Sequence, residues 1–218
     1  MNRIPVVAVS IGMATGIYAV SFGALGVTAG LSILETMLLS LLMFSGASQF
    51  AFVGVVATGG MAAIATAIAS AWLLGVRNGF YALRMAPVLG MPGITKLLSA
   101  QLTIDESTAV ATSQGNESAE RRGFWWTGVS VFVFWNLMTL AGALLGDQIG
   151  DPANYGLDSA AAAAFLGLVW PRLSSSKFKL IGLAAFIVAL ATTSIVPAGI
   201  PVLLGALVAA LIQYWGKK

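Results

Sequence analysis

Long apolar stretches separated by short polar segments dominate this chain. A bilayer core requires roughly 20 apolar residues per helix, and each residue adds about 1.5 Å of length. Each of the four charge-free stretches given below can therefore hold at least one membrane span. The second and the fourth of them are long enough for two spans. The stretches without Lys, Arg, Asp or Glu run between Arg3 and Glu35, Glu35 and Arg77, Gly123 and Gly146, and Leu180 and Gly216.

The pattern predicts an all-α, polytopic transmembrane helical bundle of about seven to eight membrane segments, some of them discontinuous. The first segment, roughly Pro5–Ser32, is too long for one upright helix, so a break near Tyr18–Gly23 is expected. Its small-residue pairs, Gly12/Gly16 and Gly26/Gly30, would allow close helix contacts in lipid. The other predicted segments are Glu35–Ala57, Met61–Ala82, Met85–Gln114, Gly123–Gly146, Ser159–Trp170, Leu180–Ile195 and Val202–Trp215.

The segment Met85–Gln114 differs from the others, because prolines, glycines and charges interrupt its apolar sequence. A helix that presented Lys96, Asp105 and Glu106 to lipid would be very costly. The segment should therefore lie against protein or a wet cavity, and a re-entrant path is one way to achieve this.

The composition agrees with a membrane protein and excludes several chemistries. Of the 218 residues, 58% are hydrophobic and only 9% are charged, against about 25% charged residues in soluble domains. Cysteine and histidine are absent, which excludes disulfides, thiolate or imidazole metal sites and Ser–His nucleophiles. We expect one integral membrane transporter domain, 1–218, that is not an enzyme and has no catalytic residues, cofactor or metal. No basic cluster beside aromatic residues indicates nucleic-acid binding.

The basic residues of the short loops predict an orientation. They fall on one side if the acidic loop Asp147–Asp158 lies on the other, and the positive-inside rule makes the basic side cytoplasmic. We therefore expect a multi-pass protein of the cell (inner) membrane with both termini in the cytoplasm. This scheme places Arg77 and Arg84 near the outer side, which is acceptable only if they face the protein interior. The basic loop residues are Arg121, Arg122, Arg172, Lys177, Lys179, Lys217 and Lys218.

Four ionisable side chains in or beside the spans are candidates for function: Arg77, Arg84, Asp105 and Glu106. Each costs about 2.5–3.5 kcal/mol at the centre of a bilayer on insertion scales, so such a residue usually marks a pathway or a partner. We expect Arg77 to be buried beside Asn78, whereas Arg84 could equally reach the interface. Asp105 and Glu106 would lie about 100° apart on a helix, so at most one should point squarely into a cavity. Alternatively, the two carboxylates begin a cytoplasmic helix.

A second candidate is the small and polar run Phe44-Ser45-Gly46-Ala47-Ser48-Gln49-Phe50 in the middle of the second segment. Its Ser45, Ser48 and Gln49 would share one helix face, while Gly46 makes unwinding easy. Transporters commonly build substrate sites at interrupted helices near the membrane midplane. The alternative is a tight helix crossing in which serine and glutamine bond between helices.

Three of these segments resemble the AzlC-type branched-chain amino acid permease family. Phe44–Phe50 resembles its signature F-[SA]-G-[AS]-x-Q-F, Val76–Tyr81 resembles N-x-R-H-x-x-Y, and Thr103–Ser107 resembles T-D-E-[ST]. The order and spacing agree, and the likeness extends over nearly the whole chain. One position departs from the pattern, because Asn78 stands where the family has histidine, so substrate preference or the coupling ion could differ.

The resemblance implies the large subunit of a two-component exporter of branched-chain or other neutral amino acids, acting with a small AzlD-like membrane subunit. It is compatible with proton coupling by a carboxylate near an arginine. The residue pattern and this resemblance together give the candidate substrate-binding residues as Ser45, Gly46, Ala47, Ser48, Gln49, Phe50, Asn78 and Tyr81, and the candidates for ion or proton coupling as Arg77, Asp105 and Glu106.

A different interpretation is an accessory or structural membrane subunit without a transport pathway of its own. It predicts that Arg77→Ala and Asp105→Asn change assembly or abundance rather than flux at equal expression. An intramembrane enzyme is not favoured, because the chain has no Ser–His pair and no G-x-S-x-G sequence.

Overall fold

Every regular element among the described residues is a helix. The computed structural model describes residues 3–90, 92–149, 166–167, 169–170, 173–197 and 199–215. In this part of the chain, three helical stretches are long and apolar enough to cross a bilayer: Ile4–Thr28, Gly46–Leu89 and Glu117–Gln148. Shorter apolar helices accompany them. The predicted all-α membrane bundle with discontinuous segments is therefore confirmed.

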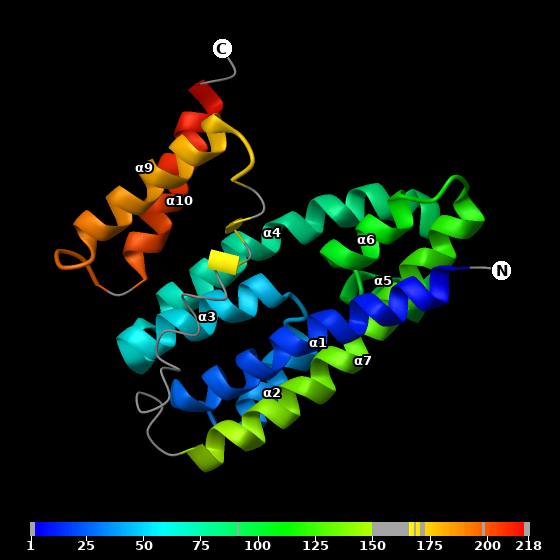
Figure 1. Ribbon diagram of the computed structural model, residues 1–218, viewed down its shortest axis with the longest axis horizontal. Helices are drawn as coiled ribbons and strands as arrows, with labels where there is room; N and C mark the ends of the chain where they lie inside the picture. Colours follow the sequence, from blue (N-terminus) through cyan, green and yellow to red (C-terminus); the bar gives the residue numbers. More distant parts are fainter. Residues whose placement is uncertain are drawn as a thin grey trace.

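Helices α1 (Ile4–Thr28) and α7 (Glu117–Ile149) make the most extensive contact of the bundle and lie side by side in Figure 1. Glycines permit this contact, because a Cβ atom on Gly23 would overlap the backbone of Thr139. Small residues let helix backbones pack closely in lipid. The facing positions advance together, so the two helices are parallel: Gly12 with Ser130, Gly16 with Phe134, Gly23 with Thr139 and Ala24 with Gly146.

Two expectations for the first segment need correction. Helix α1 is continuous through Tyr18–Gly23, so the predicted break is wrong; Gly23 serves the contact with α7 instead. Gly26 packs closely against Thr36, but Gly30 follows the helix with a φ of 95° and open space around it. Of this pair, only Gly26 makes a close helix contact, whereas Gly30 forms the turn after the helix.

The second predicted segment consists of two short helices rather than one span. Helix α2 (Ile33–Leu42) begins with a capping box in which Ser32 and Glu35 bind each other's backbone N–H groups. Hydrogen bonds from Ser32 hold the pKa of the Glu35 carboxyl below its usual range. The chain leaves the helix at Met43 and resumes it as α3 (Gly46–Gly59) beside the middle of α7. The interruption predicted around Phe44–Phe50 is present, and it divides the second segment into the helices α2 and α3.

Helix α3 leads through the short turn η1 (Gly60–Ala63) into α4 (Ile64–Leu89). The two helices are antiparallel, and α4 continues past α3 to the other end of the bundle (Figure 1). Helix α4 extends beyond the predicted end at Ala82, with Pro87 in its last turn, and stops at Gly90, whose φ is 57°. This helix is therefore the second complete span, with Arg77 near its midpoint.

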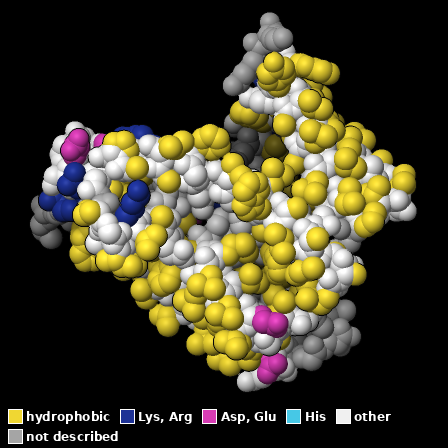
Figure 2. Space-filling model, turned by 180° about the vertical axis from the view of Figure 1, so that it is seen from behind, with side chains coloured by type: hydrophobic (Ala, Val, Ile, Leu, Met, Phe, Trp, Pro, Cys, Tyr) yellow, Lys and Arg dark blue, Asp and Glu magenta, His cyan; other side chains and the backbone are white. Residues whose placement is uncertain are grey.

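Arg84 lies at the end of the bundle where α7 begins. Its guanidinium is 3.2 Å from the Glu120 carboxylate, and the neighbouring Arg121 donates to the carbonyl oxygen of Val88. The expectation that Arg84 lies near the opposite end from Arg121 is therefore wrong, because α4 ends on the side of the bundle where α7 begins. Figure 2 shows basic side chains gathered at the end of the molecule near the N-terminus.

A second pair of short helices follows α4. Helix α5 (Gly93–Gln101) leads to Leu102, which packs at Gly128 of α7, and α6 (Asp105–Thr112) returns so that Val110 packs at Gly123. The pair therefore enters from the basic end, turns near the middle of α7 and goes back. A re-entrant path is thus observed for this region, whereas residues 85–89 belong to α4. Spans α1 and α4 are each followed by such a pair, from opposite ends of the bundle.

The last two helices form a hairpin that leans away from the bundle in Figure 1. They are α9 (Ser176–Thr192) and α10 (Ile200–Trp215), close to the predicted segments. The turn between them reaches the bundle, where Gly199 lies against Val55 and Thr66. The predicted segment Ser159–Trp170 and the loop Asp147–Asp158 lie mostly outside the described residues.

The packing of α1 on α7 yields a stability prediction. Gly23→Ala should lower the free energy of unfolding by about 1–3 kcal/mol, because the new methyl group must push two backbones apart. The measurement is the Tm of the purified protein in detergent. Gly79→Ala is the matched control, since Gly79 lies inside α4 with nothing near its Cβ position. Its Tm should stay equal or rise; an equal fall in both variants would contradict this packing.

Candidate functional site

The turning points of the two helix pairs meet inside the bundle. The side chain of Gln101 at the end of α5 donates through Nε2 to the carbonyl oxygen of Leu41 at the end of α2, at 2.7 Å. Helix α3 and helix α6 both start beside this contact, with Ser45 and Ile104 as their N-cap residues. Two helix N-termini therefore lie near the middle of the spans.

At each interruption between the short helices, a side chain forms hydrogen bonds with backbone groups that the helices leave free. Gln49 is fully buried, and its Nε2 donates to the carbonyl oxygens of Met43 at 2.9 Å and Leu39 at 3.3 Å, at the end of α2. At the second break, the hydroxyl of Ser107 accepts from the N–H of Ile104 at 3.1 Å and lies 2.6 Å from the carbonyl oxygen of Leu102. Irregular backbone at membrane depth needs such internal partners, because lipid supplies none.

A cavity of about 280 Å³ lies where these N-termini meet. This is close to the lower end of the range for small-molecule sites, which is roughly 300–1,000 Å³. It takes residues from α1, α3, α4 and α7 as well as from the two breaks, so the whole bundle shapes it. The lining residues are Thr15, Tyr18, Phe44, Ser45, Gly46, Ala47, Phe50, Leu74, Arg77, Asn78, Ile104, Asp105, Glu106, Val131, Trp135 and Val169.

One side of the cavity is charged. Arg77 of α4 and Asp105 of α6 form an ion pair with 3.0 Å between Nη2 and Oδ2, and their side chains are 27% and 31% exposed. Glu106 lines the same cavity and is half-buried. Both carboxylates therefore belong to the cavity lining, and Asp105 is turned toward Arg77. Both reach it because they are the first residues of α6, where the helix end itself borders the cavity.

The N-terminus of α3 forms a second polar part of the cavity wall. Ser45 makes no side-chain cap hydrogen bond to this helix. The first N–H groups of an α-helix have no carbonyl partner within it, and here they belong to the cavity-lining Gly46 and Ala47. The first turn of α3 contains no acidic residue, whereas α6 begins with Asp105 and Glu106. The two helix ends therefore differ in charge.

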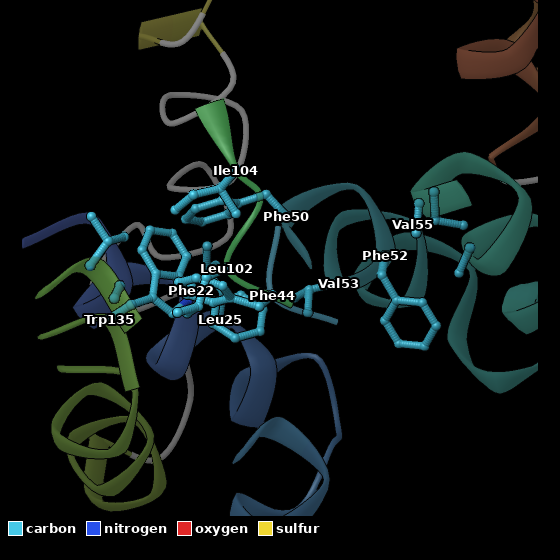
Figure 3. Close-up of a cluster of buried hydrophobic side chains, with 14 of the residues drawn as sticks. Phe22, Leu25, Phe44, Phe50, Phe52, Val53, Val55, Leu102, Ile104 and Trp135 are labelled. Atoms are coloured by element: carbon cyan, nitrogen blue, oxygen red, sulfur yellow. The ribbon is translucent and has the colours of Figure 1, made fainter. Parts of the chain in front are cut away.

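Aromatic side chains make the apolar wall, and Figure 3 shows them converging from different helices. Phe22 of α1 stacks on Trp135 of α7, with ring centroids 6.4 Å apart, and meets Phe50 of α3 edge to face at 5.8 Å. Phe44 packs edge to face on Phe132 at 5.0 Å. An apolar wall beside two polar ones can accept a small amphipathic molecule.

The structure brings most of the predicted site residues together and separates three. The cavity is lined by the predicted Ser45, Gly46, Ala47, Phe50, Arg77, Asn78, Asp105 and Glu106. Gln49 instead caps α2 behind the cavity. Ser48 lines a second groove, which shares Phe44, Ser45 and Asn78 with the cavity. Tyr81 is half-buried one turn beyond Arg77 on α4 and lines neither.

Trp135, Thr15 and Tyr18 also line the cavity, and sequence reasoning missed them. The one sequence signal that pointed to Trp135 is its position in the middle of a predicted membrane span. Tryptophan favours the membrane interface, yet Trp135 lies near the middle of α7 and is 7% exposed. Among the described residues, no group of three or more acidic side chains could hold a metal ion.

Comparison with known proteins identifies a family. The model of the AzlC protein family matches residues 10–149, which is more than half of the chain. The match extends from α1 to the end of α7 and includes both helix pairs. No curated protein and no solved structure matches the chain.

The ion pair at the cavity yields a prediction. Asp105→Asn and Arg77→Gln should each lower the Tm, because each removes one charge of a half-buried ion pair. The double variant should recover part of the loss, with a coupling energy of about 1–2 kcal/mol. The Arg84–Glu120 pair is the control, since Arg84 is 50% exposed, and its coupling should stay below about 1 kcal/mol. If the losses of stability from the two single variants simply add in the double variant, Arg77 and Asp105 do not stabilise each other.

Proposed function

Because this chain belongs to the AzlC protein family, a family of membrane proteins related to branched-chain amino acid transport, we propose that it is a secondary transporter. Its substrate is a branched-chain or other neutral amino acid, and it works as an exporter in the cell (inner) membrane. The observation that carries this proposal is the cavity at the meeting point of two helix N-termini. Three kinds of wall surround it: amide, carboxylate and aromatic.

The arrangement of charge favours a zwitterion in one orientation. A carboxylate is stabilised at a helix N-terminus, and α3 offers one without acidic residues of its own. An ammonium group is stabilised near carboxylates, which α6 supplies through Asp105 and Glu106. The substrate side chain then lies against Phe50 and Phe44. An anion or a cation alone would satisfy only one of these walls.

The carboxylates of α6 also support proton coupling. Asp105 already has Arg77 as its partner, whereas no salt bridge within 4.0 Å is found for Glu106 among the described residues. Because the chain has no histidine, carboxylates are the side chains suited to exchange protons near neutral pH. We assign this role to Glu106, with Asp105 and Arg77 positioning the cavity wall.

The partner and the orientation complete the proposal. A small AzlD-like membrane subunit acts with this chain as the second component of the exporter. Arg3, Arg84 and Arg122 lie at one end of the bundle, and the positive-inside rule favours this end as cytoplasmic. The N-terminus then faces the cytoplasm, and we place the C-terminus on the same side.

Efflux from vesicles tests the proposed function. Proteoliposomes that contain this chain and its small partner are loaded with labelled leucine, valine or methionine, and retention is followed over time. Efflux should exceed that of protein-free vesicles, because the cavity provides a route across the apolar barrier. Equal retention in both would favour the accessory-subunit interpretation and contradict the proposal.

Proton coupling is tested separately. In the wild type, acidifying the outside should accelerate leucine efflux, since protons moving inward would drive export. Glu106→Gln cannot take up this proton, so its efflux should no longer respond to the pH gradient while downhill efflux persists. Glu120→Gln, at the far end of α4 and α7, is the control and should respond like the wild type. An unchanged response in Glu106→Gln would remove Glu106 from the coupling mechanism.

A further inference from the structure

Trp135 has a buried polar atom that the packing of the bundle leaves without a partner. Its side chain is 7% exposed and lines the cavity. Among the described residues, its indole Nε1 has no hydrogen-bond acceptor. A buried donor without an acceptor is destabilising by about 1–3 kcal/mol, and tryptophan usually finds a partner for this group. An acceptor from a bound molecule would remove this cost.

The indole lies directly beside the N-terminus of α3. A Cβ atom on Gly46 would be 2.8 Å from Cη2 of Trp135 and 3.3 Å from Cζ2. Cζ3 follows at 3.5 Å, so the indole contacts the α3 terminus through the outer edge of its six-membered ring. Its position is held by the stack on Phe22, with ring planes 28° apart. The indole ring and the first residues of α3 therefore border the same cavity.

Asn78 has an unsatisfied hydrogen-bond acceptor, in contrast to the unsatisfied donor of Trp135. Its Oδ1 is a buried acceptor without a donor among the described residues, and Asn78 also lines the cavity. Two residues of the cavity lining thus carry unsatisfied polar atoms, a donor on Trp135 of α7 and an acceptor on Asn78 of α4, next to Arg77. A donor on one helix and an acceptor on another are complementary to the carboxylate and the ammonium group of an α-amino acid.

We propose that Trp135 is a substrate-positioning residue that donates its indole N–H to the carboxylate of the bound amino acid. This inference rests on the proposed function and adds a residue outside the recognised sequence segments. The carboxylate would accept from the α3 terminus and from Trp135 together, and the ammonium group would lie toward Asn78 and the α6 carboxylates. Recognition of the carboxylate would then distinguish an amino acid from the corresponding amine.

Two ligands and two variants test this assignment. Trp135→Phe keeps an aromatic ring against Phe22 but removes the N–H. Binding of labelled leucine to the purified protein gives its Kd, and competition gives the Kd of 3-methylbutylamine, which is leucine without its carboxylate. We expect the Kd for leucine to rise about tenfold, as for a lost hydrogen bond to a charged group. The Kd for the amine should change by less than about twofold.

Trp125→Phe is the matched control. It lies on the same helix and packs on Phe124 rather than in the cavity, so both ligands should bind as they do to the wild type. An equal change for leucine and the amine in Trp135→Phe, or no change for either, would overturn the assignment while leaving transport intact. Failure of the wild type to bind leucine, valine or methionine would instead overturn the proposed function, and this inference with it.

Discussion

Broken helices inside a membrane protein depend on internal hydrogen bonding, and this constraint shapes the centre of the bundle. Lipid offers no donors or acceptors, so each free backbone group must find a protein partner or face a cavity. Gln49 satisfies carbonyl groups at the end of α2, and Ser107 satisfies backbone groups around the second break. The amide groups at the start of α3 receive no such cap from Ser45. They belong to Gly46 and Ala47, which line the cavity, so this helix end is available to a bound molecule.

The scaffold that holds these breaks in place is the parallel contact of α1 with α7. Close backbone approach at Gly23 brings Phe22 onto Trp135, and the same stretch of α7 supports Gly46. Helix α4 supplies Arg77 from the other side, where Asp105 meets it. The cavity is therefore bordered by three complete spans and by two helix ends. A change in helix spacing would reach the site directly.

The two helix ends are alike in backbone geometry but differ in the charge of their side chains. Helix α6 carries Asp105 and Glu106 in its first turn, so its positive end already has negative partners. Helix α3 carries none. This difference gives the cavity an electrostatic direction that is complementary to a zwitterion. Under the proposed function, α3 would bind the carboxylate of the substrate and α6 would provide the carboxylates for coupling.

Sequence by itself determined that the chain is a helical membrane protein, that its second segment is interrupted around Phe44–Phe50, and that Arg77 and Asp105 are charges needing compensation. These properties are local, because they follow from the transfer of each residue from water into lipid. Only the tertiary structure decided that the interrupted segment turns back, that Gln49 caps α2, and that Trp135 lines the cavity. Lipid-facing and cavity-facing positions of a span can be equally apolar, so hydropathy does not separate them. Contact between distant segments, such as Gly46 with Trp135, makes that distinction.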